Sequence, residues 1–194
     1  MTYKMSDFTF YLELGLLHVL DIKAYDHMLF LVALTVPFSF KKFKTVFWIV
    51  TFFTFGHTFS LFMSAYEIYS PNETLIETLI PVTIILTALG NVIFIGRREY
   101  NKLSSFFISL IFGVIHGFGF GNYFNQISFP LESKVQPLIG FSAGVELSQL
   151  VVVLFILLFN FIILEIFNFK DSKYTTLVSV FIIGFSFNMI LNNF

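Results

Sequence analysis

Residues 45–66 read TVFWIVTFFTFGHTFSLFMSAY, an apolar segment without Asp, Glu, Lys or Arg. A helix needs about 20 such residues to cross the hydrocarbon core of a bilayer, so this segment is long enough to span it. Five further apolar stretches lie along the chain: Phe8–Phe40, Leu75–Ile95, Leu103–Phe120, Val135–Ile166 and Thr175–Leu191. The sequence therefore predicts an all-α integral membrane protein, a polytopic bundle of about six transmembrane helices in a single helical transmembrane domain, residues 1–194.

The composition agrees with a chain whose main partner is the lipid bilayer. Hydrophobic residues make up 57% of the chain and charged residues 12%, whereas about 25% of a soluble domain is charged. The formal net charge of -1 argues against nucleic acid as a partner. There is no cysteine, which excludes disulfides and thiolate metal ligands.

The first apolar stretch is interrupted by Asp21, Ile22 and Lys23. Its two halves, Phe8–Leu20 and Tyr25–Val36, are each too short to span the hydrocarbon core alone. We therefore expect a broken or interfacial N-terminal helix in addition to the spanning helices.

Basic residues predict the orientation of the bundle in the membrane. They follow the first, third and fifth stretches: Lys41, Lys42, Lys44, Arg97, Arg98, Lys102, Lys170 and Lys173. The intervening loops carry Glu67 and Glu73, then Glu132 with Lys134. Because basic loops favour the cytoplasmic side, we expect both termini on the outside.

The histidines lie at one depth relative to the basic residues. His27 precedes Lys41 by 14 positions, and His57 and His116 follow Lys44 and Lys102 by similar intervals. At 1.5 Å per residue all three lie roughly 20 Å from the cytoplasmic anchors, in the outer half of the bilayer. Imidazoles and carboxylates without thiolates suit a divalent transition metal, so the shared depth predicts one metal site.

Three carboxylates could contribute to this metal site, and each could instead have a purely structural role. Asp26 either joins His27 as a ligand, orients its imidazole or caps a helix. Glu146 belongs to a polar stripe with Ser142 and Gln149, and it could instead be protonated and hydrogen-bonded to another helix. Glu77 lies near the outer face, either as a surface carboxylate at a helix start or as part of an entrance.

Other polar and small residues are expected to support the site or the packing. Ser60 shares a helix face with His57, and His18 lies close to the break in the first stretch. Gly113 and Gly117 have the spacing that allows helices to approach closely, which packing alone also explains. Asn91 and Asn160 are expected to form interhelical hydrogen bonds.

These motifs together resemble those of the HupE/UreJ family of small bacterial membrane proteins. The segments that carry the resemblance are Gly15-Leu-Leu-His18, Tyr25-Asp26-His27-Met-Leu-Phe-Leu, Phe53-Thr-Phe-Gly-His57-Thr-Phe-Ser60, Glu77-Thr-Leu-Ile-Pro, Phe112-Gly-Val-Ile-His116-Gly-Phe-Gly-Phe and Gly140-Phe-Ser-Ala-Gly-Val-Glu146-Leu-Ser-Gln149. The resemblance implies a location in the bacterial inner (cytoplasmic) membrane and import of nickel or cobalt. It also implies that the residues handling the metal are His18, Asp26, His27, His57, Glu77, His116 and Glu146.

Two functions follow from this reading. The first is a permease for a transition-metal cation, nickel or cobalt, with its site in the outer half of the bilayer. The alternative is an intramembrane zinc-dependent hydrolase for a lipid or lipid-linked substrate, with Glu146 or Asp26 as general base. The sequence leaves open whether the protein forms a homo-oligomer.

Overall fold

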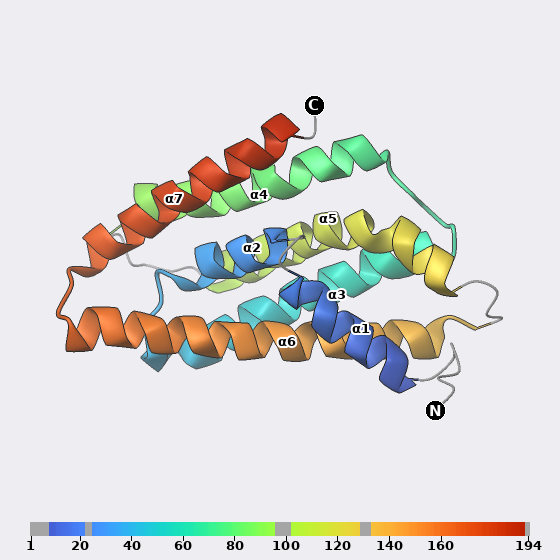
Figure 1. Ribbon diagram of the computed structural model, residues 1–194, viewed down its shortest axis with the longest axis horizontal. Helices are drawn as coiled ribbons and strands as arrows, with labels where there is room; N and C mark the ends of the chain where they lie inside the picture. The colour runs from blue at the N-terminus through green and yellow to red at the C-terminus, as the bar shows by residue number, and fades with distance from the viewer. Residues whose placement is uncertain (1–7, 22–24, 96–101, 129–132, 193–194) are drawn as a thin grey trace.

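The computed structural model describes residues 8–21, 25–95, 102–128 and 133–192, and all of its long elements are helices (Figure 1). The elements are α1 (Phe8–Leu20), α2 (Asp26–Thr35), the 3-10 turn η1 (Phe40–Lys42), α3 (Phe43–Ala65), α4 (Glu73–Ile93), α5 (Lys102–Ser128), α6 (Val135–Phe161), the π-helical turn η2 (Ile162–Ile166) and α7 (Asp171–Asn192). Within these residues five helices are long and apolar enough to cross a membrane. The predicted all-α polytopic bundle is confirmed.

Two short helices replace a sixth long one, as the interrupted first stretch predicts. Figure 1 shows α1 entering from one end of the bundle and ending near its middle, where α2 starts and continues toward the other end. Together α1 and α2 therefore follow the course of one broken spanning helix rather than a surface helix followed by a spanning one. Lys23 lies outside the described residues.

The connections divide between the two ends of the bundle. The α2–α3 and α6–α7 connections share one end, whereas the α3–α4 connection and the start of α1 lie at the other (Figure 1). The first end includes the basic residues Lys41, Lys42, Lys170 and Lys173. The loop residues Arg97, Arg98 and Glu132 lie outside the described residues. The predicted orientation depends on basic connections lying at one end of the bundle, and the connections with Lys41, Lys42, Lys170 and Lys173 do so.

Glycines bring α3 and α5 into close contact. A Cβ atom added to Gly56 would collide with the backbone oxygen of Leu110, and one added to Gly113 would collide with that of Phe53. A Cβ atom added to Gly117 would likewise collide with the backbone oxygen of His57. The absence of side chains at these positions lets the two backbones touch, which is how small residues drive association of membrane helices. The close approach predicted for Gly113 and Gly117 is confirmed.

A second glycine contact joins α1 to α6. Cβ atoms on Gly15 and Gly144 would collide with the backbone oxygens of Phe141 and Leu12, respectively. The short helix α1 is thus fixed along a long one. This contact holds the end of α1 at a defined depth inside the bundle.

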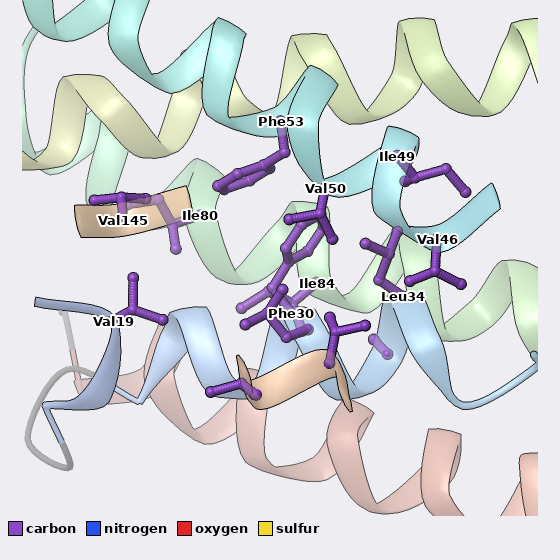
Figure 2. Close-up of a cluster of buried hydrophobic side chains, with 14 of the residues drawn as sticks. Val19, Phe30, Leu34, Val46, Ile49, Val50, Phe53, Ile80, Ile84 and Val145 are labelled. Atoms are coloured by element: carbon purple, nitrogen blue, oxygen red, sulfur yellow. The ribbon is translucent and has the colours of Figure 1, made fainter. Parts of the chain in front are cut away.

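Apolar packing and two asparagines fix α2. Figure 2 shows Phe30 and Leu34 of α2 among buried side chains of α3 and α4, such as Val50 and Ile84. The side-chain nitrogen of Asn91 donates to the carbonyl oxygen of Ala33 over 2.7 Å, and that of Asn160 donates to the oxygen of Phe38 over 3.1 Å. Tyr174 in turn donates to Oδ1 of Asn160 over 2.8 Å. Both asparagines therefore form interhelical hydrogen bonds, as predicted, and they satisfy carbonyls at the end of α2.

Candidate metal site

Three histidines from three helices meet where α1 ends and α2 begins. His18 is in the last turn of α1, His27 in the first turn of α2 and His57 in the interior of α3. One ligand nitrogen from each lies within 4.8 Å of the others. A Zn–N bond of ~2.1 Å places neighbouring tetrahedral ligand atoms roughly 3.4 Å apart, so shifts of about 1 Å would close the three nitrogens around an ion.

His116 on α5 extends the cluster to a fourth helix. Its ring centroid lies 5.5 Å from that of His27. Its Nδ1 lies 2.8 Å from the backbone oxygen of Phe112, one helical turn earlier. A carbonyl oxygen only accepts hydrogen bonds, so Nδ1 carries the proton and Nε2 keeps its lone pair. Metal-binding histidines use this arrangement, in which one ring nitrogen is held by a carbonyl and the other faces the ion.

Asp26 orients His27 rather than capping α2. One carboxylate oxygen of Asp26 lies 3.4 Å from Nδ1 of His27. The residue at the N-cap position of α2 is Tyr25, which makes no side-chain capping bond. A carboxylate on one side of an imidazole increases the basicity of the other nitrogen and fixes the ring. Of the three roles expected for Asp26, the geometry favours the orienting one.

The buried imidazoles have nitrogens without hydrogen-bond partners. His57 is fully buried and neither of its ring nitrogens has a partner among the described residues. The same holds for Nε2 of His18, of His27 and of His116, whereas Nδ1 of His27 lies 3.4 Å from the carboxylate of Asp26. A buried polar group without a hydrogen bond costs about 1–3 kcal/mol. Four such rings in one place indicate a binding site in which a ligand supplies the missing interactions.

An aromatic shell encloses the histidines. The ring of Phe120 lies 4.2 Å from that of His18, and the ring of Phe141 stacks on that of His57 with centroids 6.2 Å apart. Phe30 and Phe53 lie 5.2 Å and 5.1 Å from the ring of His116. These side chains exclude water and supply no competing donors. Neutral imidazoles in such surroundings fit a borderline divalent cation such as nickel, cobalt or zinc.

Glu146 belongs to a separate hydrogen-bonded group between α3 and α6. Thr51 donates to one carboxylate oxygen of Glu146 over 2.6 Å, and Thr54 makes a short contact with the other. Oγ1 of Thr54 also lies 3.0 Å from Oε1 of Gln149. The group of closely spaced ligand atoms contains His18, His27 and His57, so coordination by Glu146 stays a prediction.

The family assignment rests on the whole chain. A family model described as HupE / UreJ protein matches residues 2–193. The chain belongs to the HupE/UreJ family. No curated protein and no solved structure matches it.

The remaining predicted residues of this family member lie around the cluster rather than in it. The hydroxyl of Ser60 contacts backbone oxygens of its own helix, those of Gly56 and His57, and it lies against Gly117 at the contact with α5. Ser142 accepts a 2.8 Å hydrogen bond from Thr58. Glu77 is exposed near the start of α4. Ser60 and Ser142 therefore contribute to helix contacts, and the role of Glu77 at an entrance stays a prediction.

Thr51 and Thr58 are two polar contacts that the sequence reading missed. With Thr54 they recur at intervals of three and four residues on α3, which places them on one helix face. That face turns toward α6, where Thr51 meets Glu146 and Thr58 meets Ser142. The spacing of the threonines was a signal that could have identified them.

Proposed function

We propose that the protein is a permease for a divalent transition-metal cation, with nickel as the preferred substrate and cobalt as the second. One observation carries this proposal: three buried imidazoles and one partly buried imidazole, from four helices, converge with unpartnered nitrogens. Imidazole nitrogen binds nickel, cobalt and zinc in preference to hard cations such as magnesium. Membership of the HupE/UreJ family supports the same substrate class.

The position of the cluster supports transport rather than storage. It lies where the two halves of a broken helix meet inside the bundle (Figure 1). Transporters often bind ions at such interrupted helices, because helix ends offer backbone groups at membrane depth.

We propose a path for the ion from one end of the bundle to the other, past the cluster. We propose that the ion enters from the end that holds Glu77, whose exposed carboxylate would attract it. At the opposite end, a cavity of about 280 Å³ is lined by residues of η1, η2 and the end of α6: Ser39, Phe40, Lys41, Phe161, Leu164 and Glu165. This cavity would receive the ion on its release.

We propose that the protein resides in the bacterial inner membrane with its basic end in the cytoplasm. The support is the distribution of Lys41, Lys42, Lys170 and Lys173 over connections at one end of the bundle. Both termini would then lie outside. Uptake would carry the metal from the outer mouth, past the histidines, to the cavity at the basic end.

Flux measurements test the proposal. Purified protein is placed in liposomes that contain a metal-responsive dye, and nickel, cobalt or zinc is added outside. We expect nickel entry that is lost in His57→Ala, because that variant removes the most deeply buried imidazole of the cluster. Phe55→Ala is the matched control, since Phe55 lies two positions away on α3 and is 67% exposed. Equal nickel flux through the protein and His57→Ala would overturn the proposal.

The permease is favoured over the zinc-dependent hydrolase. Glu146, one of the two carboxylates expected as general base, accepts hydrogen bonds from α3, and Asp26 faces His27. Both acids are therefore occupied in holding side chains. Firmly bound zinc with no flux of any metal would instead favour the hydrolase.

A further inference from the structure

A second group of converging ligand atoms lies between α3 and α6. The α3–α6 oxygen cluster consists of Thr51, Thr54, Glu146 and Gln149. Thr54 and Thr51 precede His57 by three and six residues, so they lie roughly 4.5 and 9 Å from it along α3, toward the basic end. The α3–α6 oxygen cluster is thus the next group of polar side chains between the histidines and the basic end of the bundle.

The oxygen cluster has more acceptors than hydrogens to satisfy them. Oγ1 of Thr54 lies against three oxygens: those of Val50, at 3.3 Å, and of Gln149, at 3.0 Å, and the nearer carboxylate oxygen of Glu146. A hydroxyl has one hydrogen and can donate it to only one of them. With the Gln149 amide placed as it is, the hydroxyl hydrogen of Thr54 cannot lie in both its contact with Glu146 and its contact with Gln149. A positive ion at this point would turn those contacts into favourable ones.

Gln149 supplies a second, independent sign of a missing partner. Its side chain is fully buried, and its Nε2 has no hydrogen-bond partner among the described residues. If the amide is turned over, Nε2 can donate to Thr54, but Oε1 then takes the place without a partner. In either orientation one end of the amide requires a ligand that the four side chains do not provide.

The charge of Glu146 is not balanced by a basic side chain. Among the described residues, the side-chain partners of Glu146 are the hydroxyls of Thr51 and Thr54, and neither is basic. Glu146 lies on a spanning helix, 11 residues after the start of α6, where an ionised carboxylate facing hydrocarbon is costly. A single monovalent cation would neutralise it, whereas a divalent cation would leave one excess positive charge.

We propose that the α3–α6 oxygen cluster is a sodium site. All of its donors are oxygens, from one carboxylate, two hydroxyls and one amide, and oxygen donors select hard cations over nickel or cobalt. Its single negative charge matches a monovalent ion. Sodium binds here separately from the metal at the histidines, and its binding is independent of whether those histidines release their ion across the membrane.

Direct binding of radioactive sodium to the purified protein tests this site. Scintillation-proximity binding of ²²Na⁺ is measured with choline as the replacing cation. We expect saturable binding that falls by about tenfold or more in Glu146→Gln, which removes the only charged ligand. Thermal unfolding of Glu146→Gln in detergent is measured beside that of the parent protein and shows whether the variant is folded.

Two threonines on the same helix provide a matched pair. Thr54→Val removes a hydroxyl of the oxygen cluster and should lower sodium binding. Thr58→Val removes a hydroxyl that donates to Ser142 and should leave sodium binding unchanged. The pair also decides the question if Glu146→Gln fails to fold. His57→Ala keeps its sodium binding while it loses nickel.

Three results would overturn the sodium assignment. They are no saturable binding by the parent protein, equal binding by the parent and Glu146→Gln, and equal losses in Thr54→Val and Thr58→Val. No sodium binding, together with proton uptake by the parent protein that is lost in Glu146→Gln, would show instead that the cluster holds a proton.

Discussion

Nε2 of His116 is the candidate ligand atom whose orientation is best fixed, because Nδ1 of the same ring is held by Phe112. Removing this ring should reduce the metal content of the protein without displacing α5, since the close contact of Gly113 and Gly117 with α3 remains. We expect His116→Ala to carry less nickel per chain than the parent protein after equilibrium dialysis. The measurement is elemental analysis of both proteins at known concentration. Equal metal content would exclude His116 as a ligand.

Acid should weaken metal uptake. An imidazole coordinates a metal through a lone pair that protonation removes, so binding is complete at higher pH and is lost as the rings become charged. The proposed histidine ligands therefore predict that nickel flux falls as the outside pH drops through about 6. Initial rates in proteoliposomes between about pH 7.5 and about pH 5.5 check this. A flux that rises over this range on acidification would contradict ligation by neutral histidines.

At the level of single residues, the sequence predicted the height of a side chain along the bundle better than the neighbours toward which it points. Counting from Lys41, Lys44 and Lys102 placed His27, His57 and His116 at one height, because helix rise is regular. The neighbours of Glu146 could not be predicted in the same way. They depend on the rotation of α6 about its axis, which brings Glu146 to Thr51 and Thr54, and rotation follows from packing with other helices.

The contact between α3 and α5 positions two of the histidines of the candidate metal site, His57 and His116. A Cβ on Gly113 would collide with the backbone oxygen of Phe53, which cannot move aside as a side chain can. Gly113→Ala should therefore separate the two helices, destabilise the protein by roughly 1–3 kcal/mol and lower its nickel affinity. The measurements are thermal unfolding in detergent and nickel binding.

Gly90→Ala is the matched control for this substitution. Gly90 also lies within a spanning helix, but a Cβ added to it meets nothing within 4 Å. Alanine has the higher helix propensity, so this variant should be neutral or more stable by up to ~1 kcal/mol. Equal destabilisation by the two variants would show that the effect does not come from the α3–α5 contact.

At the level of elements, the sequence predicted the break between α1 and α2, but α5 continues to Ser128, beyond the predicted end at Phe120. Charged residues at Asp21 and Lys23 marked the interruption between α1 and α2. They could not show whether the first half lies on the membrane surface or inside the bundle. That choice depends on the contact of Gly15 and Gly144, which joins residues more than a hundred positions apart.

The orientation of the whole molecule can be tested without first replacing native cysteines, because the chain has none. Lys42→Cys and Tyr69→Cys each introduce one thiol at an exposed position, at the two opposite ends of the bundle. With a cytoplasmic basic end, a membrane-impermeant maleimide added to intact cells should label Tyr69→Cys and not Lys42→Cys. Both should react after the cells are opened. The reverse pattern would invert the proposed topology and the direction of uptake.

The distribution of the four histidines over α1, α2, α3 and α5 makes metal affinity and folding two measures of one equilibrium. No two of these rings are held in place by a single helix, so the unfolded chain has no preformed chelate. An ion that recognises only the assembled helices adds about 2.7 kcal/mol to the free energy of unfolding when its concentration is 100 times its dissociation constant. A cell deprived of the metal would therefore contain a less stable and more readily degraded protein, so that its abundance would follow the supply of its cargo.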